Sequence, residues 1–197
     1  TDHQRVIFNG DGYSDAWVKE AERRGLPNIK SMVEAIPALI TEKSVKMFEK
    51  FGVFTEAELE SRAEILFEQY AQTINIEALA TLDIAKKQIV PAVMKYQKTL
   101  ADSVAVLKAT GMDTSVQESL LGDITENLKK LYTAIGILES ETDKAQSIED
   151  MNEQARFYHD TVFGCMNAVR EPADKLEMLV AKEDWPMPSY GDLIFEV

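Results

Sequence analysis

The fold of this chain is decided by residues 55–110, which read TEAELESRAEILFEQYAQTINIEALATLDIAKKQIVPAVMKYQKTLADSVAVLKAT. Thr55 and Glu58 have the spacing of a capping box, in which two side chains satisfy free backbone amides at a helix start. The apolar residues that follow recur at steps of four, three and four residues, and they are Phe67, Ala71, Ile74, Ala78, Leu82, Ala85, Ile89, Val93, Tyr96, Leu100, Val104 and Leu107. A mean step of about 3.6 residues predicts one very long helix with a single apolar face.

Pro91 lies inside this helix, where it removes one backbone hydrogen bond and presses its ring on the preceding turn. The apolar pattern continues in phase on both sides of Pro91. We therefore expect a kink near residues 88–90 rather than an end, and Gly111 as the stop.

Two further long helices follow. Thr114 and Gln117 have capping-box spacing and predict a helix to about Thr142. Ser147 is expected to cap a last helix, with a kink at Pro172. The three matched apolar faces predict an antiparallel up-down bundle. Because the later helices are shorter, the first half of the long helix needs cover from an earlier helix, another domain or another subunit.

Residues 1–54 precede the bundle. The β-branched stretch Arg5–Phe8 predicts a short strand, and residues 9–12 predict a turn. Two short helices are expected after it, one from a Ser14 cap to about Arg24 with Gly25 as its stop, and one from about Pro37 to Phe51 with Gly52 as its stop.

The predicted fold class is therefore predominantly all-α: an antiparallel bundle of long, proline-kinked helices with a short N-terminal strand and turn. The bundle itself is assigned to residues 55–183. Residues 184–197 form a proline-rich, aromatic tail that is expected to dock on the bundle before a short strand or turn at Leu193–Phe195.

Composition narrows the function. The chain has 34 acidic and 21 basic residues, a formal net charge of −13, and no dense basic run, so nucleic acid is not an expected partner. Apolar stretches fall short of the roughly 20 residues that cross a membrane, and we expect a soluble, cytoplasmic protein. The single cysteine, Cys165, cannot form an intramolecular disulfide, and its neighbours favour a buried, inert thiol.

No residue pattern supports catalysis by this chain. The two histidines are His3 and His159, and the residues one helical turn from His159 are not metal ligands. Residues 9–14 join a strand to a helix like a phosphate loop but lack its Gly-Lys-Ser/Thr, which favours a plain turn. We therefore predict no catalytic, cofactor-binding or metal-binding residue here. Three polar residues beside the apolar face, Glu68, Asn75 and Glu77, fit interface contacts and an exposed flank equally well.

Five stretches, taken in order, resemble the C-terminal region of type III glutamine synthetases, the large bacterial form of that enzyme. They are Arg5–Ser14, Glu20–Leu26, Glu68–Tyr70 with Asn75–Ala78, Pro91–Gln97, and Trp185–Pro188. The resemblance implies a full-length ligase that joins ammonia to glutamate through a γ-glutamyl phosphate in nitrogen assimilation. It also implies ATP, Mg or Mn as cofactors, and large ring-shaped oligomers.

In that family the catalytic residues belong to a domain that would precede Thr1, so none is carried over to this chain. The resemblance thus implies a C-terminal helical segment, inactive alone, with a structural or assembly role. Residues 1–54 would link it to the upstream catalytic domain, and other subunits of a homo-oligomeric ring would be its partners. An unrelated helical protein-interaction module and an independent small enzyme are the alternatives.

Overall fold

The computed structural model describes residues 4–188 and 190–195, and within these residues it contains helices and no strand. This confirms the all-α fold class. The chain forms two compact units, Thr1–Leu66 and Phe67–Val197. The predicted domain limits, at residues 54/55 and 183/184, stay predictions.

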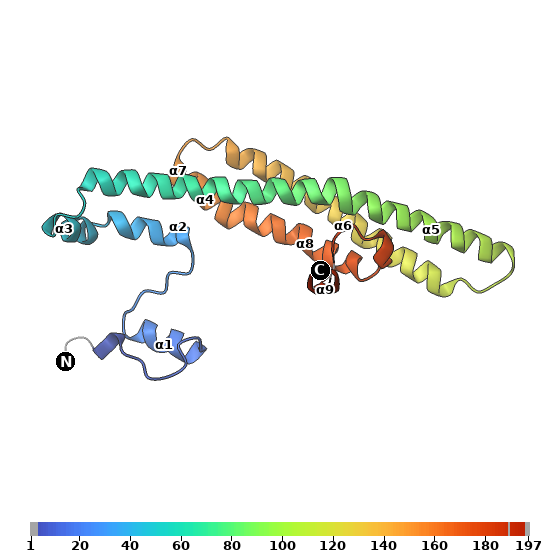
Figure 1. Cartoon of the computed structure of the whole chain (residues 1–197), viewed down its shortest axis with the longest axis horizontal. Coiled ribbons are helices and arrows are strands. Elements are labelled where there is room, and N and C mark those ends of the chain that lie inside the picture. The colour runs from blue at the N-terminus through green and yellow to red at the C-terminus, as the bar shows by residue number, and fades with distance from the viewer. Residues whose placement is uncertain (1–3, 189, 196–197) are drawn as a thin grey trace. The chain divides into compact units, whose positions relative to one another are not determined.

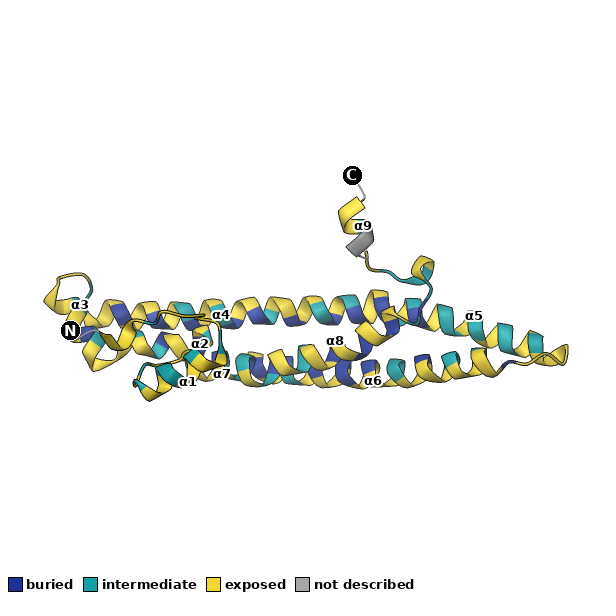
Figure 2. Ribbon diagram, turned by 90° about the horizontal axis from the view of Figure 1, so that it is seen from below, coloured by how far each residue is buried: buried dark blue, intermediate teal, exposed yellow. Residues whose placement is uncertain are grey.

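The first unit is built from short helices. In chain order they are the 3-10 turn η1 (Gln4–Val6), α1 (Asp15–Arg23), α2 (Met32–Ala35), the 3-10 helix η2 (Ile36–Ile40) and α3 (Glu42–Lys50), followed by the start of α4 (Glu56–Ile84). Its buried apolar residues are Val33, Ile36, Val45, Leu59 and Ala63. Figures 1 and 2 show α2 and α3 beside the first turns of α4. The segment from α2 to α3 therefore supplies part of the cover that the long helix was predicted to need.

Two predictions in this unit are corrected. The predicted strand at Arg5–Phe8 is wrong, because the backbone carbonyls of Arg5 and Ile7 accept hydrogen bonds from the Arg24 guanidinium, at 3.3 and 2.8 Å, in place of a sheet partner. The predicted helix over residues 37–51 is interrupted at Thr41, which is extended and whose hydroxyl oxygen accepts from the Ser44 amide to cap α3.

Other local signals are confirmed. Ser14 caps α1, and Thr55 and Glu58 form the capping box of α4, with the Thr55 amide 2.8 Å from the Glu58 carboxylate. Gly25 and Gly52 have φ of 68° and 63°, which places both in the left-handed region that glycine adopts without steric cost.

The second unit is a bundle of long helices. The chain runs out along α4, a π-helical turn η3 (Ala85–Ile89) and α5 (Val90–Ala109), returns along α6 (Ser115–Gln146), and runs out again along α7 (Met151–Phe157), a second π-helical turn η4 (Tyr158–Val162) and α8 (Phe163–Glu177). Figure 1 shows these segments side by side, which confirms the predicted antiparallel bundle.

The apolar face of the long helix is buried from Phe67 to Val93 and half-buried from Tyr96 to Leu107, as the dark blue stripe in Figure 2 shows. Instead of an ordinary turn, η3 precedes Pro91, with the Val90 amide bonded to the Ala85 carbonyl. The kink at Pro91 stays a prediction. So does the kink at Pro172, which lies inside α8 without ending it.

The helix ends of this unit differ from the predictions at three places. Thr114 does not form a capping box, because its hydroxyl donates to Glu118 while Asp113 accepts from the Ser115 amide. Thr114 is still the N-cap residue and α6 begins at Ser115, as predicted, but the helix continues past Thr142 to Gln146. Ser147 donates to the Lys144 carbonyl at the end of α6, and Asp150 caps α7 instead.

The tail forms the 3-10 turn η5 (Lys182–Asp184) and the short helix α9 (Tyr190–Phe195). Trp185 packs against the core of the bundle, which confirms the predicted docking of the tail. The predicted strand or turn at Leu193–Phe195 is wrong, because these residues are helical.

Candidate functional site

The first two stretches that carry the family resemblance meet in one small cluster. The rings of Phe8 and Trp17 stack at 4.3 Å between centroids, and the Arg24 guanidinium lies 5.4 Å from the centre of the Trp17 ring. Glu20 accepts from Arg24 at 2.6 Å and from Arg23 at 2.6 Å. We call Phe8, Trp17, Glu20, Arg23 and Arg24 the N-terminal cluster. Its residues contact one another, so its role is to hold these two stretches together.

In the turn at residues 9–14, backbone amides donate their hydrogen bonds to acceptors within the turn itself. The Tyr13 amide donates to the Asp11 carboxylate at 2.9 Å, and the Ser14 amide donates to the Asp11 carbonyl. Ser14 accepts from the Trp17 amide. Because these amides are used internally, and Asp11 adds a negative charge, the loop does not fit a nucleotide phosphate. The geometry is that of a plain turn, as the sequence favoured.

The N-terminal cluster has a consequence for pH dependence. Hydrogen bonds from Arg23 and Arg24 lower the pKa of Glu20 from 4.5 to about 2. A lowered pKa means that Glu20 stabilises the cluster fully above pH 4.5 and loses this effect as the pH falls toward 2. In a Trp185→Phe background, acid titration of Trp17 fluorescence should show a step centred at about pH 2, the pKa of Glu20 in the folded chain.

The Glu20→Gln variant should lack that step, because its side chain does not titrate. Glu22→Gln, on the same helix, is the matched control and should keep the step. An unchanged step in the Glu20→Gln variant would contradict the assignment.

Asn75 joins three segments of the bundle. Its side-chain oxygen accepts from the Tyr158 hydroxyl at 3.1 Å and from the Gln146 amide at 3.0 Å. Asn75 is thus a polar contact between α4, α6 and η4. Glu68 and Glu77, the other two residues for which both readings were open, are exposed on the helix flank. Because Gln146 and Tyr158 lie 71 and 83 positions from Asn75 in the sequence, no local pattern identified them as its partners.

His159 and Cys165 are not assembled into a reactive group. His159 contacts the neighbouring Asp160 at 2.6 Å and packs near the ring of Tyr70. Cys165 is half-buried rather than buried as predicted, and burial, with a smaller contribution from Glu141, raises the pKa of its thiol. His3 lies outside the described residues.

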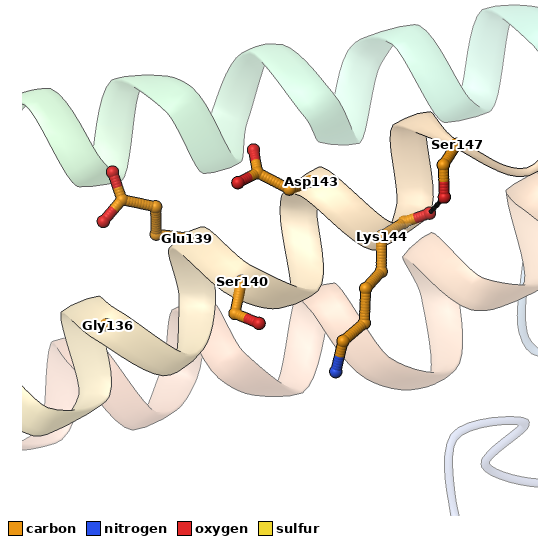
Figure 3. Close-up of a pocket in the computed structure, with 6 residues that line it drawn as sticks. All are labelled: Gly136, Glu139, Ser140, Asp143, Lys144 and Ser147. Carbon is orange, nitrogen blue, oxygen red and sulfur yellow. Dashed lines mark hydrogen bonds between the residues drawn. The ribbon is translucent and has the colours of Figure 1, made fainter.

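The described residues also do not fit a divalent metal. Within residues 4–188 and 190–195, no three His, Cys, Asp or Glu side chains lie close enough to hold one. The surface hollow in Figure 3 lies along α6, where Glu139 and Asp143 point to one side and Ser140 and Lys144 to the other. Glu139 pairs with Lys86 of η3 at 2.5 Å. This hollow lies along the surface of a single helix rather than in a cleft between elements.

In the described part of the chain, no helix combines the length and the hydrophobicity that crossing a membrane requires.

Comparison with known proteins agrees with the resemblance. The chain is 33% identical over 197 residues to a glutamine synthetase of Butyrivibrio fibrisolvens, covering 99% of this chain and 28% of that protein. It is 35% identical over 199 residues to the type-3 glutamine synthetase of Dictyostelium discoideum, covering 98% and 27%. The match to a glutamine synthetase of Bacteroides fragilis is 32% over 197 residues, covering 96% and 27%.

The chain therefore spans a little over a quarter of these relatives. A family model described as "Glutamine synthetase C-terminal domain" matches residues 1–108, which reach from the N-terminal cluster to the end of α5. This excludes the alternative of an unrelated interaction module. The chain belongs to the glutamine synthetase C-terminal domain family.

Proposed function

We propose that this chain is a structural part of a glutamine synthetase, which supports the catalytic domain and the assembly of subunits without catalysing the reaction. The proposal rests on the contacts that are made by the stretches resembling the family. Arg5–Ser14 and Glu20–Leu26 pack on each other, Asn75 joins three helical segments, and Trp185 packs on the bundle core. Their side chains stabilise this chain through contacts within it.

The complete enzyme would join ammonia to glutamate at the expense of ATP, with Mg or Mn, in the cytoplasm, as part of nitrogen assimilation and glutamine biosynthesis. The family membership and the names of the relatives support this reaction. ATP, metal and substrates would be held by the upstream catalytic domain, and the described residues of this chain offer no group of three His, Cys, Asp or Glu side chains for the metal.

The partners that we propose are this catalytic domain and other subunits of a homo-oligomeric ring. Apolar residues on the outer side of α4 support a partner there. Ile65, Ile76 and Leu79 are 49, 66 and 47% exposed, although α4 buries a complete apolar face elsewhere. Exposed apolar residues that gather on one helix are typical of protein contacts.

The proposal predicts that the isolated chain is inactive. Glutamine formation that depends on ATP, glutamate and ammonia should be absent for this chain and present for the longer enzyme. A longer enzyme lacking this region should assemble less completely, which its mass in solution would show. Measurable turnover by the isolated chain would overturn the proposal, and so would normal activity and assembly without this region.

A further inference from the structure

An apolar groove runs between the bundle and the tail. It encloses about 700 Å³, and its apolar walls come from the end of α4 with η3, from α8, and from the tail. The wall residues that matter here are Ile84, Ile89, Val169, Trp185, Met187 and Leu193. The groove is therefore a hydrophobic surface that the three long helices leave open.

Trp185, one of the wall residues of this groove, carries an unsatisfied polar group. Its indole nitrogen is buried and has no hydrogen-bond partner in the described part of the chain. Buried donors in proteins are almost always paired, because an unmade hydrogen bond is costly. The groove is thus suited to a segment that brings both apolar side chains and a hydrogen-bond acceptor, such as a backbone carbonyl.

The tail helix α9 carries such side chains. Leu193, Ile194 and Phe195 are consecutive and are 66, 66 and 82% exposed. A helix of six residues is too short to be stable without packing against other residues. Leu193 already lines the groove, and Asp192 pairs with Lys182 at 2.6 Å. These contacts keep α9 next to the groove, while Ile194 and Phe195 are not among the residues that line it.

We propose that α9 is a lid that closes over this groove, with Ile194 and Phe195 seated in it and a backbone carbonyl accepting from the Trp185 indole. Closure removes Ile194 and Phe195 from water and pairs the buried donor. The closed tail packs on both η3 and α8. It thereby holds the long helix and α8 together. This inference concerns the tail alone and does not rest on the proposed function.

Tryptophan fluorescence tests the lid, because the chain has two tryptophans and Trp17→Phe leaves Trp185 as the reporter. The full chain carrying Trp17→Phe is compared with the same chain carrying also Ile194→Ser and Phe195→Ser. We expect the acrylamide quenching constant of Trp185 to rise about twofold or more when the lid is lost. The matched control is Val106→Ser with Val116→Ser, two exposed valines on α5 and α6, which should leave quenching unchanged.

Unchanged quenching in the Ile194→Ser, Phe195→Ser chain would overturn the lid and would indicate that the groove serves another segment or subunit. If the double variant loses its helical circular dichroism signal, it is no longer folded, and the single variant Phe195→Ser is used to test the lid instead. Replacing an exposed Phe195 should alter neither quenching nor melting temperature, so an increase in quenching supports closure and no change overturns it.

Discussion

Replacing Tyr158 with Ala is expected to lower the free energy of unfolding by about 3–5 kcal/mol, the range for deleting a large buried aromatic side chain. Tyr158 is 2% exposed and lies in the π-helical turn η4. The change leaves a cavity in the core and removes the hydroxyl that donates to Asn75. Urea unfolding followed by circular dichroism would measure the loss.

Tyr132→Ala is the matched control, because Tyr132 is 68% exposed on α6 and its replacement should change stability by no more than about 0.5 kcal/mol. Tyr158→Phe isolates the hydroxyl and should cost about 1 kcal/mol, the usual net value of one hydrogen bond. A loss of similar size for the Tyr132 and Tyr158 variants would mean that η4 does not pack in the core.

The second large effect is expected at Leu138, which is fully buried in the C-terminal half of α6. Leu138→Ala should destabilise the bundle by about 2–5 kcal/mol, because the helices around the site relax only partly into the cavity. Urea unfolding again gives the value, and near-ultraviolet circular dichroism reports whether core packing is kept.

The neighbouring residue serves as the control for this prediction. Ile137 is 51% exposed, so Ile137→Ala removes a similar side chain from the same turn of the same helix without opening a core cavity. Its expected cost is well below that of Leu138→Ala. Equal costs for the two variants would show that α6 is rotated relative to the face described above.

The long helices were predictable from the sequence because their apolar periodicity extends over many turns. The stripe from Phe67 to Val93 is buried as expected, and small errors at single residues do not move such a face. The π-helical turns were not predictable. Each is a single wider turn, and the shift that it causes in the spacing of the apolar residues is smaller than the ordinary variation of that spacing along a helix.

Helix starts were predicted less reliably, since similar sequences have competing hydrogen bonds. Thr55 and Glu58 form their capping box, whereas Thr114, in the same pattern, donates its hydroxyl to Glu118. The wrong prediction of a strand at Arg5–Phe8 also results from a competing hydrogen-bond donor. Arg24 supplies donors to two of its carbonyls from 19 and 17 positions away, beyond the reach of local propensity.

The role of the residues was predictable only through the family resemblance. Periodicity placed Asn75 beside the apolar face and left its role open, because its partners come from α6 and η4. The apolar groove beside Trp185 also escaped prediction, since it is lined by residues from α4, η3, α8 and the tail, which meet only in the folded bundle.

The division between the two compact units falls between Leu66 and Phe67, inside α4 rather than in a loop. Each residue inserted into an α-helix rotates everything after it by about 100° and advances it by about 1.5 Å. Because Phe67 and the residues after it pack within their own unit, a change of length at the division would leave their buried face in place, whereas an insertion or deletion later in α4 would move part of that face out of register. The length of α4 within each unit can therefore change only together with the residues that pack on it.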